Sequence, residues 1–154
     1  MAIAMLFPIT AFAQAYVQTW DLVDSGKHLD YDGNSTYMSY INTGPATWNA
    51  YKSGVIRKDS AFVVEDVYVS DVNASNGWAG MTYSSGKIEL NTYYMSGYSN
   101  SKKQNVATHE LGHALGLDHS TSTDVMDAAI TGHTSTQALS QNDKDSYDAA
   151  YNNY

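Results

Sequence analysis

The segment from residue 109 to residue 119 reads H-E-L-G-H-A-L-G-L-D-H and holds three of the chain's five histidines. On a helix, His109 and His113 would lie one turn apart on the same face, so both imidazoles can reach one metal ion. Glu110 follows the first histidine, where a carboxylate can take a proton from zinc-bound water. Gly116 is expected to end the helix and turn the chain, so that His119 becomes the third ligand. Three nitrogen ligands with one open position indicate a catalytic zinc site rather than a structural one.

The alternative is that these histidines are ordinary core or surface residues. For a lone His-x-x-x-His pair that alternative has about even odds. The residue frequencies of this chain give the complete pattern a chance occurrence on the order of one in 10⁵. The complete pattern therefore favours a single catalytic zinc.

Several stretches resemble one protein family. The zinc motif with a methionine downstream is similar to the metzincin signature, and Ser120 after the third histidine resembles the matrixin branch. Met126, in Asp-Val-Met at 124–126, stands where matrixins place the methionine beneath the metal. Residues 139–151 resemble the matrixin C-terminal helix, and residues 77–80 with 86–91 resemble the edge strand and rim strand before the zinc helix. The resemblance covers roughly residues 48–154.

The resemblance implies an α+β fold of the zincin or metzincin type, with a twisted, mostly parallel sheet, two principal helices and a short C-terminal subdomain. It implies a zinc endopeptidase with Glu110 as catalytic base, acting on proteins or peptides as a monomer. Gly116, Met126 and Asp143 are expected to support the metal site. The strand around Trp78, Ala79 and Gly80 is expected to pair with extended substrate.

The chain also departs from matrixins. Asp127 and Ala128 follow the methionine where matrixins usually have Tyr-Pro, and Ala128 cannot act as the tyrosine that astacin-like and serralysin-like relatives carry there. Only His28 and His133 lie outside the motif, so we expect no second zinc site; both are expected at the surface. Residues 126–138 are expected to line the substrate pocket.

Composition limits the function classes. The 154 residues suit one domain, the absence of cysteine excludes disulfides and thiol ligands, and a net charge of −8 argues against nucleic acid. Residues 1–15 resemble the apolar and cleavage regions of a signal peptide and are too short for a membrane span, although a buried strand is the alternative. We therefore expect a secreted catalytic domain at residues 16–154, free of the membrane. Without a cysteine to mask the metal, the enzyme is expected to be active once folded.

Local patterns predict the elements around the motif. Residues 35–51 have helical spacing that Gly44 and Pro45 must interrupt. The zinc helix is predicted at 101–115, with a capping box of Ser101 and Gln104, and a last helix at 140–151 is capped by Ser140 with Asp143. Strands are predicted at residues 16–23, 55–57, 61–64, 67–72, 78–83 and 87–91.

Calcium binding is possible at two places. Residues 30–34 read D-Y-D-G-N, with clustered oxygen ligands and a turn glycine, but without the spacing of an EF-hand. Asp66, Asp71 and Asn73 could supply oxygens from a neighbouring loop. A solvated turn is about twice as probable as a calcium site at residues 30–34.

Two other functions compete with peptide hydrolysis. A secreted zinc-containing binding or adhesion module is one, but a structural metal would have no use for Glu110 beside an open position. A hydrolase of a non-peptide amide, as in a cell-wall polymer, is the other. The resemblance to an edge strand favours an extended peptide.

Overall fold

The computed structural model describes residues 14–60 and 64–154. These residues form a five-stranded sheet with helices packed beside it. The strands lie in the order β2-β1-β3-β5-β4. Neighbours among the first four run parallel, and β4 pairs antiparallel with β5 at the edge. This mostly parallel sheet with helices confirms the predicted fold class. The strands are β1 (Leu29–Gly33), β2 (Ile56–Lys58), β3 (Val67–Val72), β4 (Gly80–Tyr83) and β5 (Lys87–Asn91).

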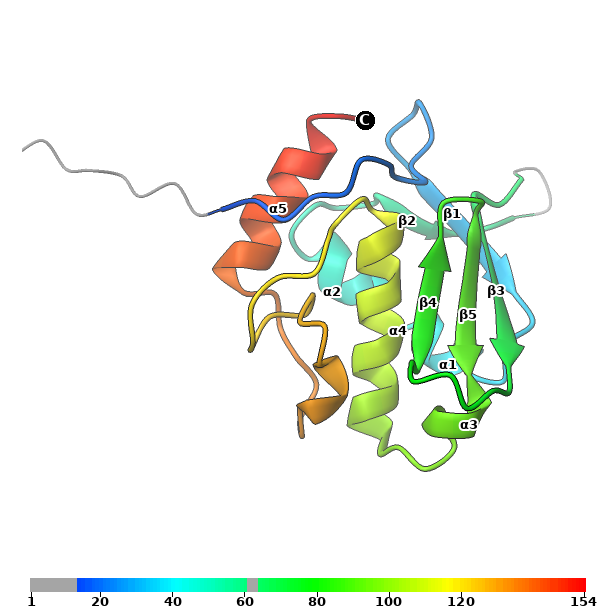
Figure 1. The fold of residues 1–154 in the computed structure, drawn as a ribbon. Helices are drawn as coiled ribbons and strands as arrows, with labels where there is room; N and C mark the ends of the chain where they lie inside the picture. The colour runs from blue at the N-terminus through cyan, green and yellow to red at the C-terminus, as the bar shows by residue number, and fades with distance from the viewer. Residues whose placement is uncertain (1–13, 61–63) are drawn as a thin grey trace, which may run out of the picture.

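Two long helices dominate the helical part, as predicted. Helix α4 (Asn100–Ala114) runs beside the edge strand β4, and α5 (Gln141–Tyr151) lies on the other side of α4 (Figure 1). The remaining helices are short: α1 (Met38–Ile41), α2 (Pro45–Asn49), α3 (Thr92–Met95) and the 3-10 helix η1 (Ile130–Gly132). Within the described residues, no helix is both long enough and apolar enough to cross a membrane.

Helix α4 owes its stability to burial, since it is buried continuously from Asn105 to Ala114. Its N-cap is Ser99, whose hydroxyl accepts a hydrogen bond from the backbone N–H of Lys102. The predicted capping box of Ser101 and Gln104 is therefore wrong. The N-cap lies two residues earlier than that pair requires, which leaves the Gln104 amide free to donate to the backbone oxygen of Tyr40.

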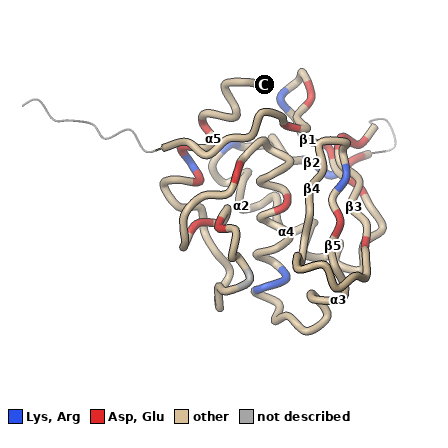
Figure 2. Tube along the Cα trace, in the orientation of Figure 1, with Lys and Arg blue, Asp and Glu red and all other residues tan. Residues whose placement is uncertain are grey.

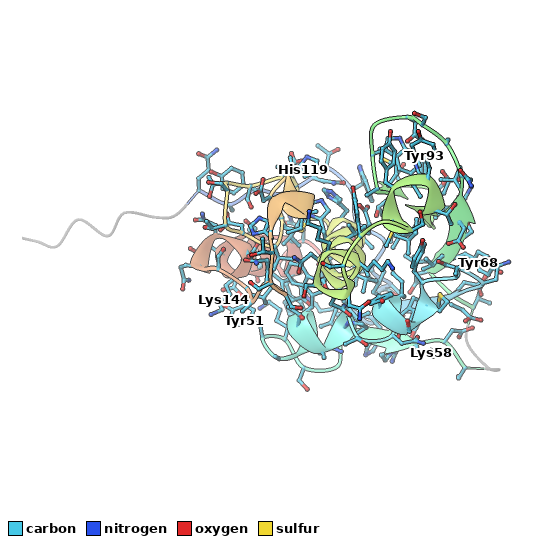
Figure 3. All side chains as sticks on the ribbon, turned by 90° about the horizontal axis from the view of Figure 1, so that it is seen from below. Tyr51, Lys58, Tyr68, Tyr93, His119 and Lys144 are labelled. Atoms are coloured by element: carbon cyan, nitrogen blue, oxygen red, sulfur yellow. The ribbon has the colours of Figure 1, made fainter. Side chains whose placement is uncertain are left out.

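Helix α5 has the predicted capping box. The Ser140 hydroxyl accepts from the N–H of Asp143, and the Asp143 carboxylate accepts from the N–H of Ser140. Edge-to-face packing of Tyr147 on Trp48, with ring centroids 5.6 Å apart, joins this helix to α2. Lys144 extends over the Tyr51 ring at the same junction (Figure 3).

Other local predictions fail for physical reasons. Residues 16–23 form no strand, because the segment runs along the end of α4, with one antiparallel bridge from Val17 to Leu117, and does not join the sheet. The predicted interruption at Gly44 and Pro45 is confirmed, since residues 35–51 form two short helices divided before Pro45. Strand β4 starts at Gly80 rather than at residue 78. Of the strand predicted at 61–64, residues 61–63 lie outside the described residues, and Val64 belongs to no strand.

Charge is spread through the fold. Figure 2 shows the Asp and Glu positions scattered over strands, helices and loops. The net charge of −8 is therefore distributed along the chain rather than gathered on a single element.

Candidate active site

Helix α4 and the turn after it bring three imidazoles together. His109 and His113 lie in the last turns of the helix and are buried, whereas His119, labelled in Figure 3, is exposed. One ring nitrogen from each histidine lies within 4.8 Å of the other two. The turn is made by Gly116, whose φ of 85° is a conformation that only glycine adopts cheaply. The three predicted ligands thus form one cluster.

The hydrogen bonds of the two buried rings decide which nitrogen faces the shared space. Nδ1 of His109 lies 2.8 Å from the backbone oxygen of Val125, and Nδ1 of His113 lies 2.8 Å from that of Leu117. A carbonyl can only accept, so each Nδ1 carries the hydrogen and each Nε2 keeps its lone pair. These are the tautomers that a metal bound at Nε2 requires.

The spacing and the ionisation of these rings fit zinc. Nε2 of His113 and Nε2 of His119 are 3.2 Å apart. Two nitrogens bound to a tetrahedral zinc at their usual distance would be about 3.3 Å apart. Burial is the main cause that lowers the pKa of His109 to about 3 and that of His113 to about 4. Both rings are therefore neutral at neutral pH and ready to ligate.

Glu110 lies in the same cleft as the three histidines, and its carboxylate contacts strand β4. Its carboxylate oxygen Oε2 is 2.7 Å from the hydroxyl of Thr82, which donates to it. Burial raises the pKa of Glu110 to about 7, and the hydrogen bond from Thr82 acts in the opposite direction. A buried carboxylate with a pKa near neutrality suits proton transfer.

Two residues of β4, Thr82 and Gly80, contact Glu110, and the sequence pattern identifies only Gly80. No sequence motif identifies Thr82, although it is a polar residue two positions from Gly80 and so lies on the same side of the strand. Gly80 was predicted as a substrate-binding residue. A Cβ on Gly80 would lie 2.5 Å from Oε1 of Glu110, so the absent side chain makes room for this carboxylate.

The methionine turn, residues 124–126, contacts the zinc helix at His109 and Gly112. Met126 is buried, and a Cβ on Gly112 would lie 2.3 Å from its sulfur. The carboxylate of Asp143 accepts from the backbone N–H of Val125 at 2.9 Å and from that of Met126 at 3.2 Å. Helix α5 thus holds the turn against α4. The sequence alone does not identify Gly112 as a supporting residue, because a glycine inside the zinc motif carries no chemistry of its own.

A cleft of about 430 Å³ opens over the site. Trp78, Ala79 and Gly80 line one side of it. Of the described side chains in the pocket segment predicted at 126–138, Ala128 and Ile130 line it. The described residues that line the cleft are Gln18, Gly77, Trp78, Ala79, Gly80, Met81, Thr82, Tyr94, Tyr98, Val106, His109, Glu110, His113, Asp118, His119, Ala128 and Ile130.

The prediction that His133 is exposed is wrong. Its side chain is only 13% exposed, and its Nε2 lies 3.0 Å from a carboxylate oxygen of Asp127. This pair closes the loop that follows the methionine turn. His28 is half-buried, with Nδ1 3.7 Å from Asp24.

The loop proposed for calcium at residues 30–34 is instead strand β1 and its end, so the predicted turn is wrong. The regular pairing of β1 with β2 and β3 fixes its backbone. The Asp30 carboxylate is bound by the Arg57 guanidinium, with Nε 2.9 Å from Oδ1. Asp66 accepts from the N–H of Asp30, and Asp71 accepts from Ser35 and Thr36.

A comparison with protein families agrees with this geometry. The family model described as Matrixin matches residues 10–152, so the chain belongs to the matrixin family of zinc metalloproteases. The comparison with curated protein sequences gives no match.

Among solved structures, the chain is similar to high choriolytic enzyme 1, a hatching enzyme zinc-protease from the medaka fish Oryzias latipes. The identity is 14%, with 97% of this chain and 99% of that one covered and a TM-score of 0.49. It is also similar to the GM1-bound form of the ECX AB5 holotoxin, at 17% identity and a TM-score of 0.46. That match covers 70% of this chain and 59% of the toxin chain.

Proposed function

We propose that this chain is a secreted endopeptidase that cleaves extended segments of proteins or peptides with one catalytic zinc. The observation that carries the proposal is the position of Glu110, a buried carboxylate in the same cleft as the three histidines. His109, His113 and His119 would hold the metal. Bound there with one position open, zinc would supply an acidified water molecule and polarisation of a peptide carbonyl.

Proton transfer falls to Glu110. Its carboxylate takes the proton of the attacking water and returns it to the nitrogen of the departing amine. The Thr82 hydroxyl stabilises the charged form of the carboxylate and fixes its orientation through the 2.7 Å hydrogen bond. The space left by Gly80 allows the carboxylate to lie against β4.

Strand β4 supports the preference for an extended substrate. It is the edge strand of the sheet, paired only with β5 among the described strands, and the residues from Gly77 to Thr82 line the cleft. An extended peptide can add to such an edge through backbone hydrogen bonds. Trp78 and Ala79 would flank the substrate where the strand begins.

Export is part of the proposal. The signal-like segment at residues 1–15 supports secretion, with residues 16–154 as the catalytic domain. We propose that the domain acts as a monomer outside the cell, with no nucleic-acid partner and no membrane attachment once the signal is removed.

Casein cleavage by the purified full chain tests the proposal. We expect new N-termini with zinc present, none after treatment with a chelator, and none from Glu110→Gln. Zinc binding without cleavage of casein or of other unfolded proteins would contradict an endopeptidase and favour the binding module. Release of amines from a cell-wall polymer, with proteins left intact, would favour the non-peptide amide hydrolase.

A further inference from the structure

The segment at residues 16–22 lies against the C-terminal end of the zinc helix. Figure 1 shows it in blue, crossing the end of α4 beside α5. Its backbone bonds to this region at several points: Gln18 donates to the oxygen of Gly116 at 2.8 Å, and Leu22 donates to that of Ala114 at 2.9 Å. Asp118 donates back to Tyr16 at 2.9 Å. The segment thus follows the turn that carries the chain from His113 to His119.

One side chain of this segment reaches a metal ligand. The terminal amide of Gln18 lies 2.9 Å from Nδ1 of His113, and Gln18 also lines the cleft. Nδ1 of His113 is the atom that donates to Leu117 at 2.8 Å. Gln18 and Leu117 therefore meet the same N–H, which lies opposite the nitrogen that faces the metal.

The hydrogen on Nδ1 of His113 indicates the orientation of the Gln18 amide. An NH₂ group facing Nδ1–H would set a donor against a donor. In that orientation Oε1 of Gln18 is buried and has no hydrogen-bond partner among residues 14–60 and 64–154. Turning the amide by 180°, which does not change its shape, places Oε1 on the imidazole N–H. A shared hydrogen bond then runs from His113 to both Leu117 and Gln18.

We propose that Gln18 is a positioning residue for the zinc ligand His113, and that the N-terminal segment is thereby part of the metal centre. Its oxygen holds the ring so that Nε2 points to the zinc, and it makes this nitrogen a stronger ligand by drawing on the N–H of the same ring. Gln18 contributes no ligand atom.

Each buried zinc ligand is oriented by a backbone carbonyl, and Gln18 is a second partner of His113. His109 is oriented by Val125 of the methionine turn, which α5 holds through Asp143. His113 is oriented by Leu117, in the turn that follows its own helix, and this turn has Gln18 and the N-terminal segment beside it. Docking of the segment and zinc binding are therefore coupled, because each stabilises the same turn.

The proposal rests on the zinc site of the proposed function and is tested by metal affinity. Loss of a hydrogen bond to a ligating imidazole typically costs about 10- to 100-fold in metal affinity. Gln18→Leu keeps a similar volume and removes the acceptor, so we expect zinc affinity, measured by chelator competition, to fall by about that factor. Gln18→Glu keeps an acceptor and should bind zinc at least as tightly as the wild type. The absorption spectrum of the cobalt-substituted protein should change in Gln18→Leu and remain close to wild type in Gln18→Glu.

Thr19→Leu is the matched control, because Thr19 is the exposed neighbour on the same segment. Its zinc affinity should equal that of the wild type, and the thermal unfolding of the zinc-free Gln18→Leu protein should match that of zinc-free Thr19→Leu. Unchanged zinc affinity and cobalt spectrum in Gln18→Leu would overturn the proposal, as would equal losses in the two leucine variants. Failure of the wild type to bind zinc would instead refute the zinc site itself.

Discussion

Gly112 and Met126 are in such close contact that even one added methyl group would not fit between them. A Cβ on Gly112 would lie 2.3 Å from the sulfur of Met126 and 2.7 Å from the ring of Trp48. The zinc helix therefore packs directly on the methionine turn. The contact is made at Gly112, which lies between the buried ligands His109 and His113 in the sequence. The distance from the metal site to its support is set by the absence of a side chain at residue 112.

Gly112→Ala should consequently destabilise the protein despite the better helix propensity of alanine. Overpacking in a buried site usually costs about 1–3 kcal/mol, more than the roughly 1 kcal/mol that alanine gains over glycine in a helix. Urea unfolding of the zinc-free protein measures the effect. Gly97→Ala is the control, since a Cβ there has no neighbour closer than 3.9 Å. Equal stability of the two variants would show that Met126 and Trp48 yield easily.

Glu110→Gln should abolish peptide hydrolysis while leaving zinc binding intact. The amide has the shape of the carboxylate but cannot accept the proton, and loss of a general base costs about 10²-fold or more in rate. Metal analysis of the dialysed protein and casein cleavage are measured on the same sample. Loss of zinc from this variant would mean that Glu110 helps to hold the metal.

Thr82→Val should move the acid limb of kcat/KM to higher pH. Glu110 works as a base only when deprotonated, so activity must fall as the pH drops through its pKa. Burial raises the pKa of Glu110 to about 7, and the hydrogen bond from Thr82 lowers it, as a bound zinc also would. Removal of the Thr82 hydroxyl should therefore raise the pKa of Glu110. The comparison requires full pH profiles of both proteins with zinc bound. A profile shifted to lower pH, or not shifted, would contradict the role of Thr82.

Asp143→Asn should loosen the methionine turn. The carboxylate accepts hydrogen bonds from the backbone of Val125, Met126 and Ser140, and an amide has only one oxygen to offer them. A buried donor left without a partner costs about 1–3 kcal/mol. We expect a lower urea midpoint together with weaker zinc binding, because Val125 orients His109. Asp145→Asn on the same helix is the control.

The extent to which the sequence predicted the site follows from the kind of interaction involved. The spacing of His109, His113 and His119 is local, so the helix period and one glycine turn sufficed to place them near each other. The partners of these residues are distant in sequence. Thr82 and Gln18 are ordinary polar residues in sequence, and they gain their roles only because β4 and the N-terminal segment lie beside α4.

The fold shows the same division. Strands at residues 67–72 and 87–91 were predicted at their observed bounds, since their apolar runs are bounded by turn residues. The segment at 16–23 alternates like a strand but lies against the end of α4. Strand β1 was predicted as a turn because residues 30–33 contain two acidic side chains and a glycine. The ion pair between Asp30 and Arg57 of the adjacent strand accounts for a buried charge that a single segment cannot reveal.

Gly80→Ala separates two reasons for a small residue at the start of β4. If Gly80 served only to let a substrate backbone approach, alanine would raise KM and leave the zinc-free protein unaffected. The structure instead predicts a clash, because the new Cβ would lie 2.5 Å from Oε1 and 2.7 Å from Cγ of Glu110. Glu110 must then rotate out of its hydrogen bond with Thr82, so kcat should fall more than KM rises, while zinc stays bound. Ala79→Gly, one residue earlier, is the control for changes in strand flexibility. Steady-state kinetics on a peptide cleaved by the wild type decide the matter: an effect on KM alone would assign Gly80 to substrate contact rather than to the placement of the base.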